Sequence, residues 1–239
     1  MALSGAIPIY LERGEKRTFA GAIEWPGWCR SGKDEPSAVQ VLLESGPRYA
    51  RVLARSRLGF RAPADVGTFD VVERLRGDAT TDFGAPGAKP LADDRTLDAA
   101  ELRRLRSILQ ACWRGFDEAV KVARGRTLTK GPRGGGRPLS SIVKHVLEAE
   151  GGYLGALGWK YKLETAGPRA LDLLRAAVLE GLAASARGEI PATGPRGGRR
   201  WKPRFLVRRS AWHVLDHAWE IEDRMRPLVP GDAARARRS

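Results

Sequence analysis

Residues 203–225, PRFLVRRSAWHVLDHAWEIEDRM, decide how the rest of the chain is interpreted. Their apolar residues recur at helical spacing, which predicts an amphipathic helix with one buried face. His213 and His217 are four residues apart, so both imidazoles lie on one side of this helix, with Cβ atoms about 5–6 Å apart. Two imidazoles in that position can reach one metal ion. The other polar residues on the same line of the helix are Arg209, Glu220 and Arg224.

Three further helices are predicted before this one, over residues 98–123, 138–158 and 168–186. In the first two of them the apolar residues follow a single stripe, as they do on a helix that packs against a core. Four helices of roughly 19–26 residues joined by loops are typical of a four-helix bundle. The second half of the chain is therefore predicted to be all-helical.

All three histidines of the chain fall on two of these helices, with His145 on the second and His213 and His217 on the fourth. A single histidine on a half-apolar face is usually a hydrogen-bonded residue of the core or its rim. The joint placement of all three instead favours a divalent-metal site. Three imidazole ligands leave a coordination position open, as catalytic sites do, and they suit Zn, Ni, Fe or Mn alike.

The segments IVKHVLEAEGGYLGALG (142–158) and RRSAWHVLDHAWEIEDR (208–224) together resemble the DinB-like superfamily of four-helix bundles. The resemblance covers roughly residues 96–228. It rests on one histidine in the second helix and an HxxxH pair in the fourth. It implies an up-down-down-up bundle with a divalent metal on His145, His213 and His217.

Characterised members of this superfamily include thiol-dependent S-transferases and the mycothiol-dependent maleylpyruvate isomerase. The resemblance therefore implies a metalloenzyme that holds a low-molecular-weight thiol as thiolate for attack on a small electrophilic or anionic substrate. A hydrolase, in which the ion activates water, is the other reaction open to such a site.

Four charged residues near the histidines are candidates for catalytic roles. Glu148 or Glu220 could orient an imidazole N–H or act as a base, and Arg209 or Arg224 could hold an anionic substrate. For each of the four taken singly, a salt bridge at the surface or between helices is the simpler interpretation.

The first part of the chain has a different period. Short β-favouring runs at residues 7–12, 17–25 and 67–75 surround a helical pattern that starts near Glu35 and Pro36, which predicts a β-β-α-β unit. Its Pro-Gly turn, second glycine and acidic helix start are weakly similar to small HicB-like domains. The chain is thus expected to be α+β, and its expected parts are a small domain (1–76), a linker (77–94), the bundle (95–228) and a basic tail (229–239).

The formal net charge of +14 is concentrated in two places. Residues 1–98 hold equal numbers of basic and acidic residues, whereas residues 124–137 and 187–209 are rich in arginine. The related phrases GPRGGGRP and GPRGGRRWKPR, which begin at Gly131 and Gly194, open an alternative function, a non-catalytic interaction module or nonspecific nucleic-acid binder. Neither phrase is a P-loop, and in the DinB-like topology the two loops lie at opposite ends of the bundle.

Two cysteines exclude a disulfide framework or a cysteine-based zinc knuckle. No apolar run has the length of a membrane span, and the apolar run near the N-terminus is too short for a signal peptide. We therefore expect a cytoplasmic location, no membrane partner and a small-molecule substrate, and a homodimer stays open as an alternative.

Overall fold

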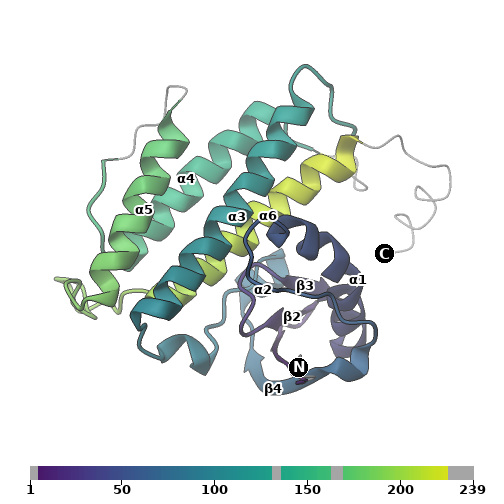
Figure 1. The fold of residues 1–239 in the computed structure, drawn as a ribbon, viewed down its shortest axis with the longest axis horizontal. Coiled ribbons are helices and arrows are strands. Elements are labelled where there is room, and N and C mark those ends of the chain that lie inside the picture. The colour runs from purple at the N-terminus through teal and green to yellow at the C-terminus, as the bar shows by residue number, and fades with distance from the viewer. Residues whose placement is uncertain (1–4, 131–135, 163–168, 226–239) are drawn as a thin grey trace.

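The computed structural model describes residues 5–130, 136–162 and 169–225. The fold is mixed α+β, with a four-stranded sheet near the N-terminus followed by helices. In Figure 1 the sheet and its helix lie at one side of four long helices that run next to one another. The expected α+β class is confirmed.

The sheet contains β1 (Ile7–Arg13), β2 (Thr18–Ala22), β3 (Cys29–Gly32) and β4 (Phe69–Arg76), in the order β3-β2-β1-β4. β1 pairs antiparallel with β2 and parallel with β4, and β2 pairs antiparallel with β3. The crossover from β3 to β4 contains α1 (Glu35–Leu53), which packs on β2 and β3. The side chain of Asp34 accepts a hydrogen bond from the Ser37 N–H and caps α1, with Pro36 in its first turn as predicted.

The predicted β-β-α-β order is wrong by one strand, because β3 lies between the second strand and the helix. The sequence there was interpreted as a turn, and the turn exists: Gly27 has a φ of +94°, a conformation that glycine adopts without strain. The chain then continues as a strand of four residues, whose pairing partners come from β2. A strand this short is specified by its partner more than by its own pattern.

The four long helices agree with the predicted stretches to within about two residues at each end. They are α3 (Ala99–Ala123), α4 (Leu139–Leu157), α5 (Ala170–Ala186) and α6 (Pro203–Met225). α6 packs against α3 and α4, and α5 packs mainly on α4. α6 is therefore covered on several sides, and most of its residues are buried.

The segment predicted as a linker, residues 77–94, contains a short helix and a 3₁₀ turn, α2 (Ala79–Phe83) and η2 (Leu91–Asp94). It lies against the face of the sheet that carries Glu12, whose buried carboxylate accepts hydrogen bonds from the Thr81 hydroxyl and from the N–H groups of Gly87 and Ala88. A second 3₁₀ turn, η1 (Val66–Thr68), precedes β4. The domain boundaries themselves stay a prediction.

Arg208 of α6 joins this segment and the sheet to the long helices. Its buried guanidinium makes two hydrogen bonds to the Asp93 carboxylate, at 2.7 and 2.8 Å, and donates to the carbonyl oxygens of Ala22 and Ile23. Burial disfavours the charged form, but the Asp93 carboxylate outweighs it and raises the pKa of Arg208 above its ordinary value. The ion pair is therefore largely shielded from water, and four hydrogen bonds are made by the guanidinium.

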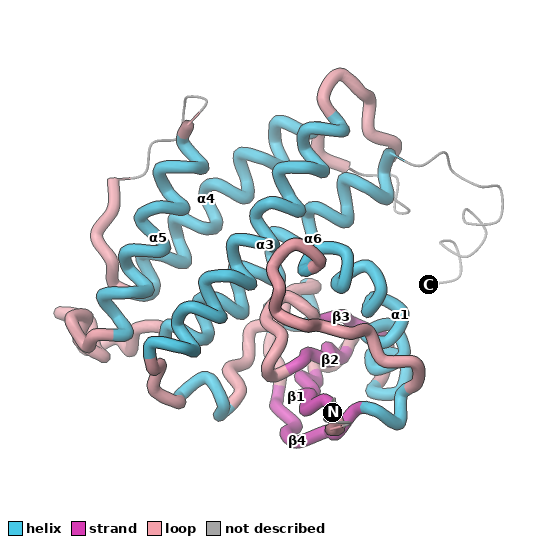
Figure 2. Tube along the Cα trace, in the orientation of Figure 1, coloured by secondary structure: helices cyan, strands magenta, loops and turns pink. Residues whose placement is uncertain are grey.

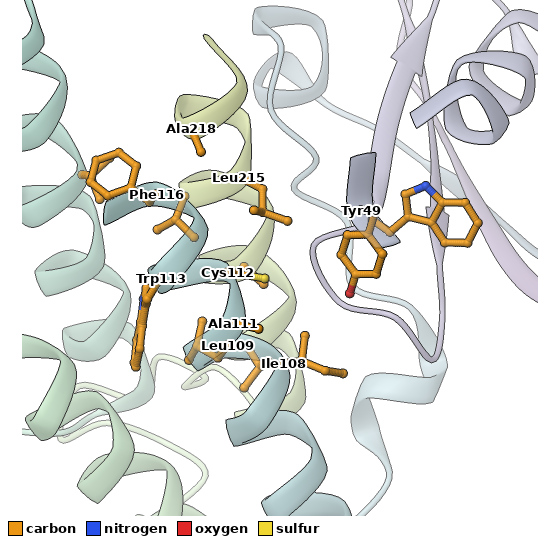
Figure 3. Close-up of a cluster of buried hydrophobic side chains, with 14 of the residues drawn as sticks. Tyr49, Ile108, Leu109, Ala111, Cys112, Trp113, Phe116, Leu215 and Ala218 are labelled. Atoms are coloured by element: carbon orange, nitrogen blue, oxygen red, sulfur yellow. The ribbon is translucent and has the colours of Figure 1, made fainter. Parts of the chain in front are cut away.

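The hydrophobic core is continuous between the first part of the chain and the helices. One cluster of buried side chains includes Trp28 and Tyr49 together with Cys112, Phe116 and Leu215. Figure 3 shows Tyr49 on one side of this cluster and residues of α3 and α6, among them Cys112 and Leu215, on the other. Because this buried apolar cluster runs without a break from the first part of the chain into the long helices, the two parts are expected to unfold together.

The two arginine-rich loops lie at opposite ends of α6. Thr129, in the loop before α4, exchanges two hydrogen bonds with Arg224 at the C-terminal end of α6: its carbonyl oxygen accepts from Arg224 Nε, and its hydroxyl donates to the Arg224 carbonyl oxygen. Trp201, in the other loop, comes two residues before the N-terminal end of α6. Figure 2 shows the described parts of these loops in pink at the two ends of the long helices. A helix of 23 residues is about 33 Å long, so the described parts of the two loops do not form one patch. Residues 131–135, with most of the first arginine-glycine phrase, lie outside the described residues.

Among the described residues, no helix combines the length and the apolar character that crossing a bilayer requires.

α4 carries a buried glutamate, Glu150, that contacts side chains of α3 and α5. Glu150 accepts a hydrogen bond from Trp113 Nε1 at 2.6 Å, and the Arg175 guanidinium lies 4.0 Å from its other oxygen. Burial raises the pKa of Glu150 to about 7, and the arginine and the tryptophan oppose that rise only in part. The carboxyl group therefore holds a proton over much of the acidic range.

We expect Asp93→Asn to destabilise the protein by about 3 kcal/mol, because the Arg208 charge would remain buried without its counter-ion. The matched control is Glu24→Gln, which removes an exposed ion pair to Arg95 and should cost less than about 1 kcal/mol. Chemical denaturation measures both values. Equal effects of the two substitutions would contradict a structural role for the Arg208–Asp93 pair.

The raised pKa of Glu150 predicts a pH-dependent stability. Between about pH 4.5 and pH 7 the folded protein holds the proton that the unfolded chain has lost, so the free energy of unfolding falls as pH rises, by up to about 1.4 kcal/mol per pH unit. Glu150→Gln should remove this component of the slope in denaturation experiments across the range. Glu148→Gln, at an exposed position two residues away, should keep it, and a variant of Glu150 with an unaltered slope would contradict the assignment.

Candidate metal centre

The three histidines converge from two adjacent helices, as the sequence predicted. His145 lies on α4, and His213 and His217 lie one turn apart on α6, which packs against α4. One ring nitrogen of each histidine lies within 4.8 Å of the others, so the three could hold one ion. Among the described residues this is the one group of at least three metal-ligating side chains that meets so closely.

The spacing of the imidazoles fits ligands of a common ion. The Nε2 atoms of His145 and His213 are 3.2 Å apart. Two nitrogens bound about 2.1 Å from one ion are separated by about 3.0 Å at a right angle and by about 3.4 Å at a tetrahedral angle. The observed separation lies between these limits, so these two ligands need little movement to bind.

The third imidazole is oriented by an acidic residue. Glu220 Oε2 lies 2.9 Å from His217 Nδ1, which leaves Nε2 of His217 as the nitrogen free to bind a metal. The second oxygen of Glu220 accepts a hydrogen bond from Arg224 Nη1 at 2.8 Å, and Arg224 Nε donates to the carbonyl oxygen of Thr129. The hydrogen bond from His217 and the neighbouring charges keep the pKa of Glu220 below its usual range.

Two of the imidazoles are held neutral. Burial, the imidazoles of His217 and His145, and nearby arginines lower the pKa of His213 to about 2. Burial and His217 also lower the pKa of His145. Metal binding requires the unprotonated form of the ring, so these two residues are in the right state near neutral pH.

The histidines form the floor of an open pocket of about 600 Å³. Tyr153 and Trp212 are its aromatic walls, and Tyr153 packs edge-on against the His213 ring at 5.6 Å between centroids. The opposite rim is supplied by the segment before α3. It consists of Thr80, Phe83, Gly84 and Ala85.

The charged residues of the pocket leave an excess of positive charge. The two acids in its lining have cationic partners, Asp216 with Arg30 at 3.0 Å and Glu220 with Arg224. Arg209 donates a hydrogen bond to the uncharged carbonyl of Pro86 and lies over the rings of Tyr153 and Trp212. Arg137 also lines the pocket, and no acidic group within the described parts of the chain forms an ion pair with it. An anionic group is therefore favoured here.

The four charged candidates from the sequence occupy different positions. Glu220 contacts an imidazole, and Arg209 lines the pocket. Arg224 pairs with Glu220 and is not itself part of the pocket lining. Glu148 lies farther out, about half exposed, and pairs with Lys144 at 3.7 Å.

The sequence did not reveal the pocket residues other than the histidines and their charged neighbours. Phe83 and Thr80 lie in the stretch interpreted as a linker, where no local pattern marks a site. Tyr153 is eight residues after His145 on the same helical stripe, so its spacing could have identified it as a neighbour of the metal ligands.

Comparison with protein-family models, with curated proteins and with solved structures gave no match to this chain. The function of the centre is therefore inferred from its own residues and their geometry.

The Glu220–His217 contact predicts an effect on metal affinity. Glu220→Gln should weaken Zn²⁺ binding about tenfold, because a carboxylate that orients a ligand imidazole also raises its basicity. The control is Glu148→Gln, which should bind Zn²⁺ within about twofold of the parent protein. Titration against a competing chelator measures both affinities, and the same affinity for all three proteins would show that Glu220 does not support the centre.

Proposed function

We propose that this chain is a divalent-metal protein of the DinB-like type and that it catalyses transfer of a low-molecular-weight thiol to a small electrophile. The observation that carries the proposal is the convergence of three imidazoles at the floor of an open pocket. A structural metal site would be closed by a fourth protein ligand, whereas three ligands leave a position for a small molecule.

The arrangement of the long helices supports the same assignment. α4 and α6 contribute one and two histidines respectively, the distribution expected for the superfamily. We propose that α3 to α6 form the up-down-down-up bundle of that superfamily. The likeness of the first part of the chain to HicB-like domains stays a prediction.

A bound Zn, Ni, Fe or Mn ion would act as a Lewis acid that lowers the pKa of a thiol or of water. The protein's own residues position the reaction. His145, His213 and His217 would hold the ion, Glu220 orients His217, and Arg209 and Arg137 would attract the anionic part of a substrate.

The thiol has to come from outside the chain. Both cysteines are buried, and burial raises the pKa of Cys29 to about 12 and that of Cys112 higher still. Neither can supply a thiolate near neutral pH. An external thiol, by contrast, can enter the open pocket.

The test uses the protein loaded with Co²⁺, whose absorption reports its ligands. Addition of N-acetylcysteine should produce a thiolate-to-cobalt charge-transfer band, and N-acetyl-S-methylcysteine should not. His145→Ala, at a partly buried position, should lose cobalt and the band together. Circular dichroism confirms that the variant is folded.

Two results would contradict the proposal in different ways. A protein that binds no cobalt would overturn the metal centre. A protein that binds cobalt and shows no charge-transfer band with the thiol would retain the centre and overturn thiol transfer, in favour of activation of water.

A further inference from the structure

We infer that the segment 77–94 completes the pocket over the three histidines, and that Phe83 selects small molecules that carry an aromatic or similar apolar group beside an anionic group. The part of this inference that concerns the anionic group of the ligand rests on the proposed function, because the metal ion would help to bind that group. The part that concerns the apolar group of the ligand rests on Phe83 and can be tested separately.

Phe83 is the starting observation. Its side chain is 87% exposed, more than any other large hydrophobic side chain among the described residues, and it lines the pocket. An apolar ring in water gains free energy when another apolar surface covers it. A ligand in the pocket is in position to provide that surface.

The backbone that carries Phe83 is firmly attached. Asp78 caps α2 through the Thr80 N–H at 2.7 Å, and Thr81 donates to the buried Glu12 carboxylate at 2.5 Å. Asp82 accepts hydrogen bonds from the N–H groups of Lys16 and Glu15, at 2.8 and 3.2 Å. These bonds hold the segment before residue 83, and the bonds from the Gly87 and Ala88 N–H groups to the Glu12 carboxylate hold it after residue 83. The exposed ring therefore belongs to a segment that is attached on both sides.

The same segment is attached to α6 on its other side. Arg209 Nη1 donates to the carbonyl oxygen of Pro86 at 2.5 Å, and Asp93 pairs with Arg208. The rim that carries Phe83 is thereby held next to the helix that carries His213 and His217. The first part of the chain thus supplies one wall of the site.

The pocket contains the complementary chemistry for both ends of such a molecule. Phe83, Tyr153 and Trp212 offer aromatic surface, while Arg137 and Arg209 offer positive charge not balanced by an acid in the pocket lining. A volume of about 600 Å³ lies within the range of small-molecule sites. An aryl or alkyl carboxylate with a short spacer combines the two groups.

The test compares 3-phenylpropanoate with propanoate, which differ only in the phenyl group, by isothermal titration calorimetry with and without bound Zn²⁺. The unaltered protein should bind the phenyl compound at least about tenfold more tightly. Phe83→Ala should reduce this preference to about threefold or less. Leu91→Ala is the matched control, because Leu91 is 73% exposed in the same segment and does not line the pocket, and it should keep the full preference.

An unchanged preference in Phe83→Ala, an equal loss in Leu91→Ala, or no binding of either compound to the unaltered protein at millimolar concentration would overturn the inference. The metal content of each sample is measured in parallel. A Phe83-dependent preference in protein that takes up no Zn²⁺ would support the inference while contradicting the proposed metal centre.

Discussion

A guanidinium group can be buried only where the surrounding chain supplies acceptors for its N–H groups, and Arg208 has this requirement at the centre of the molecule. Its acceptors come from two separate parts of the chain, the carbonyl groups of Ala22 and Ile23 at the end of β2 and the carboxylate of Asp93. Satisfying one side chain of α6 therefore fixes the sheet and the segment 77–94 against the long helices. The continuous hydrophobic core fills the space between them.

The candidate centre depends on that arrangement. α6 carries Arg208 toward the sheet, and five residues later it presents the first of its two histidines to His145 on α4. Because Asp93 and Pro86 belong to the same segment, the contacts that attach the sheet also place Phe83 at the rim of the pocket. The stability of the fold and the formation of the site thus both depend on α6. On the same helix, Glu220 connects His217 to Arg224 through hydrogen bonds.

The features that could be predicted from the sequence are those set by local pattern. The long helices have periodic apolar stripes, and the spacing of His213 and His217 specifies a shared face, so both were predicted close to where the structure places them. β3 was missed because its four residues form a strand through pairing with β2. The pocket rim was missed because glycines and prolines in residues 77–94 are typical of a linker, while the contacts that hold it come from Glu12 and Arg208, far away in sequence.

The central claim is that His145, His213 and His217 bind one ion through their ring nitrogens. X-ray absorption spectroscopy of the zinc-loaded protein tests it most directly, because the spectrum reports the number, type and distance of the ligands. The account predicts three imidazole nitrogens at about 2.0–2.1 Å with the remaining coordination filled by oxygen. A spectrum with fewer than three imidazoles, or with no zinc retained by the folded protein, would contradict it.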